Sequence, residues 1–85
     1  MIYAAVCDDE PAMLEQMHRV ISETFSANQI DCQLSCFQSG ADMLKALREQ
    51  TFSIIFLDIL MPDRDGFDIA REVRSIHRRN VAITR

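Results

Sequence analysis

Three aspartates stand where short apolar runs of this chain end. Asp8 and Asp9 directly follow the run from Ile2 to Cys7. Asp58 directly follows the run from Phe52 to Leu57. A positioned carboxylate can act as a nucleophile toward phosphorus, and grouped carboxylates can hold a hard divalent cation such as Mg²⁺. Either chemistry requires that the intervening segments bring the three residues to one place.

The segments around these aspartates alternate between strand and helix patterns. The strands are marked by short apolar or alternating runs, and the helices by apolar residues at steps of three and four. The expected order is a strand over Ile2 to Cys7, a helix from Pro11 to about Ala27, a strand over Ile30 to Phe37, a helix through about Gln50, a strand over Phe52 to Leu57, a helix from Phe67, and a strand over Val81 to Thr84.

Three local signals refine this reading. The alternation of apolar and polar residues from Ile30 to Phe37 indicates an edge strand with one face more exposed to water. Ser39 followed by Asp42 resembles a helix-capping box. The uninterrupted apolar run from Phe52 to Leu57 indicates a central parallel strand that is covered on both faces.

The β-α-β-α-β-α-β order predicts an α/β fold, a doubly wound parallel sheet with right-handed crossovers. Ligands of such sheets collect at the carboxyl ends of the strands, near the point where the winding reverses. If the first and third strands are neighbours, Asp8, Asp9 and Asp58 lie within a few ångströms of one another. Such crowding of negative charge is unfavourable without a cation, and the sequence therefore predicts a Mg²⁺ site there.

Each acidic motif also has an ordinary structural explanation. Asp8 and Asp9 suit the N-terminus of a helix because the macrodipole favours acids there, and Asp58 suits a turn at the end of a strand. The combination on the first and third strands, followed by the loop from Met61 to Gly66, favours a functional site over this explanation.

CDDE at positions 7–10 and FLDILMPDRDGFDIAREVR at positions 56–74 resemble the receiver domains of two-component response regulators. The resemblance covers essentially the whole chain and implies a flavodoxin-like fold. It implies that Asp58 is the phosphoacceptor, that Asp8 and Asp9 bind Mg²⁺ together with Asp58, and that the backbone carbonyl of Leu60 completes the protein's ligands. The Cys before the acid pair and the spacing to Ser39-Gly40 resemble regulators that carry a LytTR-type output domain.

The same resemblance implies the partners. A sensor histidine kinase donates the phosphoryl group, and the phosphorylated domain controls an output domain, expected to bind DNA, that is absent from this chain. Such a receiver is a phosphoacceptor regulatory domain and not an enzyme. Its expected location is the cytoplasm.

The chain departs from complete receivers at its C-terminal side. Because the family's complete receivers have five strands and five helices, we expect residues 1–85 to form a partial receiver with no second domain. Thr84 is the candidate for the switch hydroxyl, although it lies slightly early after Asp58, and the equivalent residue is also allowed just past Arg85. The lysine of the fifth strand has no counterpart. We expect impaired phosphorylation and self-association, either by pairing at the fourth strand's edge or by exchange of an element.

Composition excludes several other classes of protein. A net charge of −4 argues against direct contact with nucleic acid. No apolar run is long enough to span a membrane. The three cysteines, an odd number, fit reduced and buried thiols better than disulfides or a zinc site.

Two other functions compete with the phosphorylation switch. A phosphatase of the haloacid-dehalogenase type also forms an aspartyl-phosphate, but it needs a second Asp two positions after the nucleophile, where this chain has Leu60. The second alternative is a truncated receiver that acts only as an interaction or dimerisation module.

Overall fold

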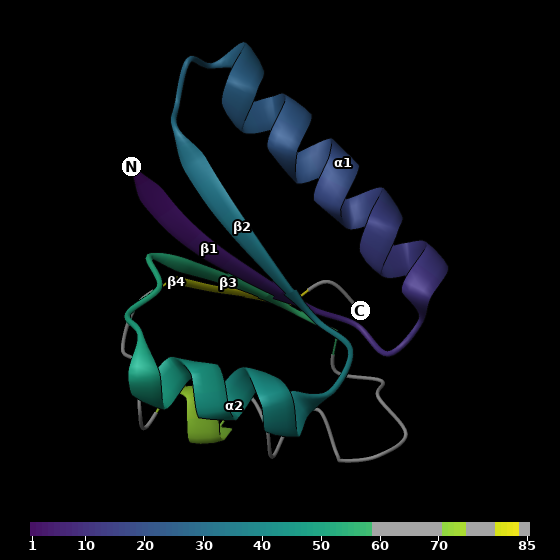
Figure 1. The fold of residues 1–85 in the computed structure, drawn as a ribbon, viewed down its shortest axis with the longest axis vertical. Coiled ribbons are helices and arrows are strands. Elements are labelled where there is room, and N and C mark those ends of the chain that lie inside the picture. The colour runs from purple at the N-terminus through teal and green to yellow at the C-terminus, as the bar shows by residue number, and fades with distance from the viewer. Residues whose placement is uncertain (59–70, 75–79, 84–85) are drawn as a thin grey trace.

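The chain folds into a parallel sheet with helices on both of its faces (Figure 1). The structure, a computed structural model, describes residues 1–58, 71–74 and 80–83. Its elements are β1 (Ile2–Cys7), α1 (Pro11–Ala27), β2 (Cys32–Phe37), α2 (Gly40–Glu49), β3 (Ile54–Leu57) and β4 (Asn80–Ile83). Residues 71–74 are also helical.

The strands lie in the order β2-β1-β3-β4, and each pairs in parallel with its neighbours. This order confirms the predicted doubly wound α/β fold and the adjacency of the first and third strands. It also confirms that the second strand is an edge strand. The register places Cys7 opposite Phe37 of β2 and Leu57 of β3, so the carboxyl ends of three strands meet at one border of the sheet.

Helix α1 begins at Pro11, which needs no backbone hydrogen bond in the first turn. Leu14 and Ile21, two turns apart, are its buried residues and pack toward the sheet. The helix ends where the Asn28 side chain donates to the carbonyl of Thr24 over 2.7 Å. Gln29 then adopts a left-handed backbone conformation, with φ of 59°, which turns the chain toward β2.

Helix α2 is capped as the sequence indicates. The Ser39 hydroxyl accepts a hydrogen bond from the Asp42 backbone N–H over 3.2 Å, which satisfies one of the free donors of the first turn. Met43, Leu44 and Leu47 form its buried face. In Figure 1, α2 lies on the face of the sheet opposite α1.

The main core lies between α2 and the sheet. Its buried members come from both central strands, from α2, from the connection between α2 and β3, and from the helical residues 71–74: Ala5, Cys7, Met43, Leu44, Leu47, Phe52, Ile55, Leu57 and Val73. The rings of Phe37 and Phe52 meet edge to face there, with their centroids 6.5 Å apart. This cluster holds the carboxyl ends of β1 and β3 in place.

Cover on the other face is uneven. Ala4 and Val6 of β1 are fully buried beneath α1, whereas Ile54 and Phe56 of β3 are only half-buried. The expectation that this strand is covered on both faces is therefore met on the α2 side alone, because α1 packs over β1 and β2.

Three strand starts and the state of the thiols differ from expectation. β2 begins at Cys32 and not at Ile30, and β3 begins at Ile54 although the buried Phe52 precedes it. β4 begins at Asn80 and not at Val81. Cys7 is buried, but Cys32 is half-buried and Cys36 is exposed, and all three are free thiols. Among the helices that the structure describes, none has the length and apolar character needed to cross a membrane.

Candidate functional site

The first two acids of the site leave the end of β1. The Asp8 backbone N–H donates to the carbonyl of Phe37 over 3.1 Å, which continues the β1–β2 ladder by one residue. The Asp8 side chain is 1% exposed, and its Oδ1 accepts a hydrogen bond from the Glu10 N–H over 3.0 Å. Asp9 is half-buried. The Asp8 carboxylate is therefore held by backbone at the mouth of the loop.

Sequence reasoning missed this contribution of Glu10. The contact is that of an Asx turn, in which an aspartate side chain accepts from the N–H two residues further on. An aspartate placed just before a helix start was the available signal, since Pro11 opens α1.

The third acid leaves the end of β3. The Asp58 backbone N–H donates to the carbonyl of Cys7 over 3.1 Å, so the β1–β3 ladder also continues by one residue. The Asp58 side chain is fully buried. Since Cys7 and Leu57 are register partners, the acids that follow them leave the sheet side by side.

The structure thus brings together all three predicted acids. Asp8, Asp9 and Asp58 each offer a carboxylate oxygen, and these oxygens lie within 4.8 Å of one another. Three carboxylates at this separation, two of them buried, repel one another strongly unless positive charge is present. A small hard cation meets this need, and Mg²⁺ is bound in proteins by one or two carboxylates together with water and phosphate oxygens. The residues present therefore fit a Mg²⁺ ion.

Two other predicted site residues, Leu60 and Thr84, lie outside the described part of the chain. Their expected roles as a carbonyl ligand and as a switch hydroxyl remain predictions.

Comparison with known proteins agrees with this geometry. The response regulator receiver domain family matches residues 4–84, nearly the whole chain. The chain belongs to this family. A receiver domain is a phosphoacceptor regulatory module rather than an enzyme, and the acidic group at the ends of β1 and β3 is consistent with a phosphoacceptor switch.

Two curated response regulators illustrate the relationship. An uncharacterized response regulatory protein of Vibrio cholerae is 30% identical over 70 residues, which cover 82% of this receiver and 26% of that protein. The sensory transduction protein LytR of Staphylococcus haemolyticus is 28% identical over 71 residues, 84% of this receiver and 26% of that protein. The receiver thus spans about a quarter of the length of these relatives.

Solved receivers share the fold. The response regulator TrrA of Thermotoga maritima, crystallised in complex with Mg²⁺-BeF, superposes with a TM-score of 0.79 at 25% identity and covers 98% of this receiver. The match spans 66% of the TrrA chain. A second structure holds TrrA in complex with the histidine kinase ThkA. One of its chains superposes with a TM-score of 0.71 at 23% identity, and the match covers 98% of this receiver and 67% of the matched chain.

Proposed function

We propose that this receiver is a phosphoacceptor switch of a two-component system, with Asp58 as the phosphorylated residue. The observation that supports the proposal most is the group of three carboxylates within 4.8 Å at the ends of β1 and β3. In the reaction, an Asp58 carboxylate oxygen attacks the phosphorus of a phosphohistidine on a sensor histidine kinase. The P–N bond breaks, the O–P bond forms, and the imidazole leaves with its electron pair.

Asp8, Asp9, Asp58 and the backbone carbonyl of Leu60 are the proposed protein ligands of Mg²⁺. The ion supplies positive charge that balances the crowded carboxylates and the phosphoryl oxygens. Asp8 is held by the Glu10 N–H and by its own backbone bond to Phe37, so a ligand on β1 keeps a fixed position relative to the nucleophile on β3. Such preorganisation is the main contribution that a protein makes to phosphoryl transfer.

The test is phosphorylation of Asp58→Asn. Incubation with acetyl phosphate and Mg²⁺ should give a hydroxylamine-sensitive adduct on the unaltered protein, in reduced yield because the lysine of the fifth strand has no counterpart, and none on the variant, as read by mass spectrometry. Asp31→Asn, which changes an exposed acid remote from the site, is the matched control and should label normally. Equal labelling of Asp58→Asn and the unaltered protein would refute the assignment.

The partners and context belong to the same proposal. We infer that the phosphoryl donor is a cytoplasmic kinase, and that the output is a LytTR-type DNA-binding domain that regulates transcription. The 28% identity to LytR supports the LytTR-type output domain. The complex of TrrA with ThkA supports, by analogy, a histidine kinase as the phosphoryl donor. Thr84 is the proposed switch residue within the chain.

A second candidate function is an interaction module that no longer takes phosphate. The half-buried Ile54 and Phe56 on the α1 side of β3 favour it, because such apolar surface supports association through the β4 edge or through exchange of an element. Mg²⁺ binding separates the two functions, since a phosphoacceptor needs the ion and a pure interaction module does not. A monomeric sedimentation profile at micromolar concentration would refute the second candidate.

A further inference from the structure

The outer edge of β2 carries unused hydrogen-bonding groups. The carbonyls of Asp31 and Phe37 accept from the N–H groups of Ile2 and Asp8 on β1, over 2.8 and 3.1 Å. Since successive backbone groups of a strand point to opposite sides, the odd-numbered residues of β2 bond to β1 and the even-numbered ones point away from it. The N–H and C=O groups of Cys32, Leu34 and Cys36 therefore face outward, and in the described part of the chain β2 has no other neighbour than β1.

The side chains of this strand are chemically symmetric about Leu34. The sequence from Cys32 to Cys36 reads Cys-Gln-Leu-Ser-Cys, with an apolar centre, a polar residue on each side and a cysteine at each end. None of these residues is charged, although natural edge strands are usually protected by charged residues, proline or a bulge. In an antiparallel copy centred on Leu34, these five residues pair leucine with leucine, cysteine with cysteine and glutamine with serine, and Phe37 lies opposite Asp31 beyond them.

We propose that β2 pairs with β2 of a second copy of this chain, antiparallel, about a twofold axis at Leu34. Leu34 then faces Leu34 of the second copy, and Gln33 faces Ser35, where the amide can bond to the hydroxyl. The outward residues form three hydrogen-bonded pairs, each exchanging two backbone hydrogen bonds. Because the same patch serves both copies, the contact is isologous and closes as a dimer.

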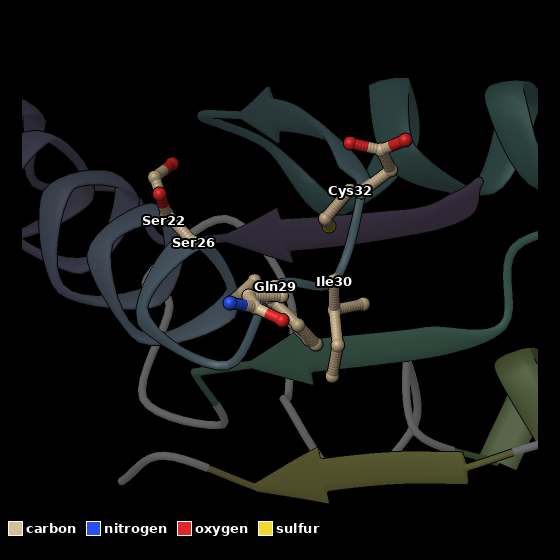
Figure 2. A pocket seen from close by; sticks show the side chains of 7 residues that line it. Ser22, Ser26, Gln29, Ile30 and Cys32 are labelled. Atoms are coloured by element: carbon tan, nitrogen blue, oxygen red, sulfur yellow. The ribbon is translucent and has the colours of Figure 1, made fainter.

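The surroundings of the strand allow an approach from this side. A pocket of about 440 Å³ lies where the end of α1 meets the start of β2, and its lining includes the small side chains of Ser22 and Ser26 together with Cys32 (Figure 2). Cys36 is exposed. Each copy carries a net charge of −4, so contact through an uncharged strand keeps like charges apart. Added salt should strengthen the contact because it screens the remaining repulsion between the copies.

The pairing makes a specific prediction for the two cysteines of β2. Cys32 of one copy faces Cys36 of the other, with a Cα separation of roughly 5.5 Å for a hydrogen-bonded pair. This separation lies in the range that disulfides adopt. An added oxidant therefore traps the dimer by removing one hydrogen from each thiol, and the two crosslinks are both of the 32–36 type.

The experiment uses the variants Cys32→Ser and Cys36→Ser, alone and in an equimolar mixture, with diamide as the oxidant at alkaline pH. Alkaline conditions are needed because partial burial raises the pKa of the Cys32 and Cys36 thiols. Non-reducing electrophoresis measures covalent dimer, and peptide mapping assigns its bond. Cys7 is present in every variant and is fully buried. Its failure to form a crosslink therefore shows that a variant is folded.

We expect abundant covalent dimer from the unaltered chain and from the mixture, and only background from either variant alone. A Cys36–Cys36 or Cys32–Cys32 bond in a single variant, at the level of the mixture, would overturn the proposed register. Background levels in the mixture would overturn the dimer itself.

A second comparison does not depend on thiol chemistry. Cys36→Lys places a charge on the edge of β2, whereas Gln16→Lys adds the same charge at an exposed position of α1. In sedimentation runs over a concentration series, Cys36→Lys should shift the monomer–dimer equilibrium toward monomer by at least tenfold relative to Gln16→Lys. Equal equilibria for the two variants would also refute the proposal.

Discussion

At the scale of single residues, burial distinguishes Asp8 and Asp58 from the other acids that the structure describes. Asp8 and Asp58 are 1% and 0% exposed, whereas Asp31, Asp42 and Glu49 are exposed. A buried carboxylate loses the stabilisation that water gives its charge, and only hydrogen bonds or a nearby opposite charge can replace that stabilisation. Repulsion among the three carboxylates is therefore a local source of instability that a bound cation would reduce.

Mg²⁺ should raise the melting temperature of this receiver, because a ligand that binds only the folded state stabilises it. At a hundredfold excess over the dissociation constant the gain is about 2.7 kcal/mol. Asp9→Ala should abolish most of this gain while keeping the fold, as measured by thermal unfolding with and without the ion. Asp31→Ala, the matched control, should respond to Mg²⁺ like the unaltered chain, and an equal response of Asp9→Ala would count against the metal site.

Asp58→Asn should stabilise the fold when no divalent ion is present. The substitution removes one of three negative charges within 4.8 Å, and the relieved repulsion is on the order of 1 to 3 kcal/mol at the effective dielectric constant of proteins. Urea unfolding in EDTA measures the change. A lower free energy of unfolding for the variant would mean that Asp58 is stabilised by the protein's own groups and not by an ion.

At the scale of elements, the sequence predicted the starts of helices and strands better where a polar group or proline marks the boundary than where apolar residues do. Pro11 and Ser39 mark the starts of α1 and α2 correctly, because the cap and the missing N–H act locally. Ile30 and Phe52 are apolar but precede their strands. Phe52 packs in the core cluster whereas Ile30 is exposed, and apolar character alone cannot distinguish either of them from a strand residue.

The cap of α2 can be tested directly. Ser39→Ala removes the oxygen that accepts from the Asp42 N–H and should lower the free energy of unfolding by about 1 kcal/mol. Ser39→Asp keeps an acceptor at the same position and should restore most of the loss. Equal destabilisation by both variants in chemical denaturation would show that the hydrogen bond contributes little.

At the scale of the whole molecule, the two faces of the sheet differ in how completely they are covered. The α2 face holds a cluster of buried residues. On the α1 side, Val20 is 52% exposed, and Ile54 and Phe56 of β3 are half-buried. Stability should therefore depend mainly on the α2 side.

A pair of truncations checks this asymmetry. Leu47→Ala leaves a cavity in the α2 cluster and should cost about 2 to 5 kcal/mol, enough to unfold much of a chain of this size. Val20→Ala should change stability by less than about 0.5 kcal/mol. The comparison uses circular dichroism during urea titration, and similar costs for the two variants would mean that Val20 is packed as tightly as Leu47, contrary to its exposure.

The adjacency of β1 and β3 has one more consequence, for the size of ion that the site accepts. Neighbouring strands lie about 4.8 Å apart in any sheet, and the acids of this site continue both ladders by a single residue. The backbone therefore fixes where the Asp8 and Asp58 side chains leave the sheet, side by side at one border. A set of only three carboxylates would suit the small Mg²⁺, whose coordination is completed by water and phosphate oxygens, whereas the larger Ca²⁺ takes roughly six to eight oxygen ligands.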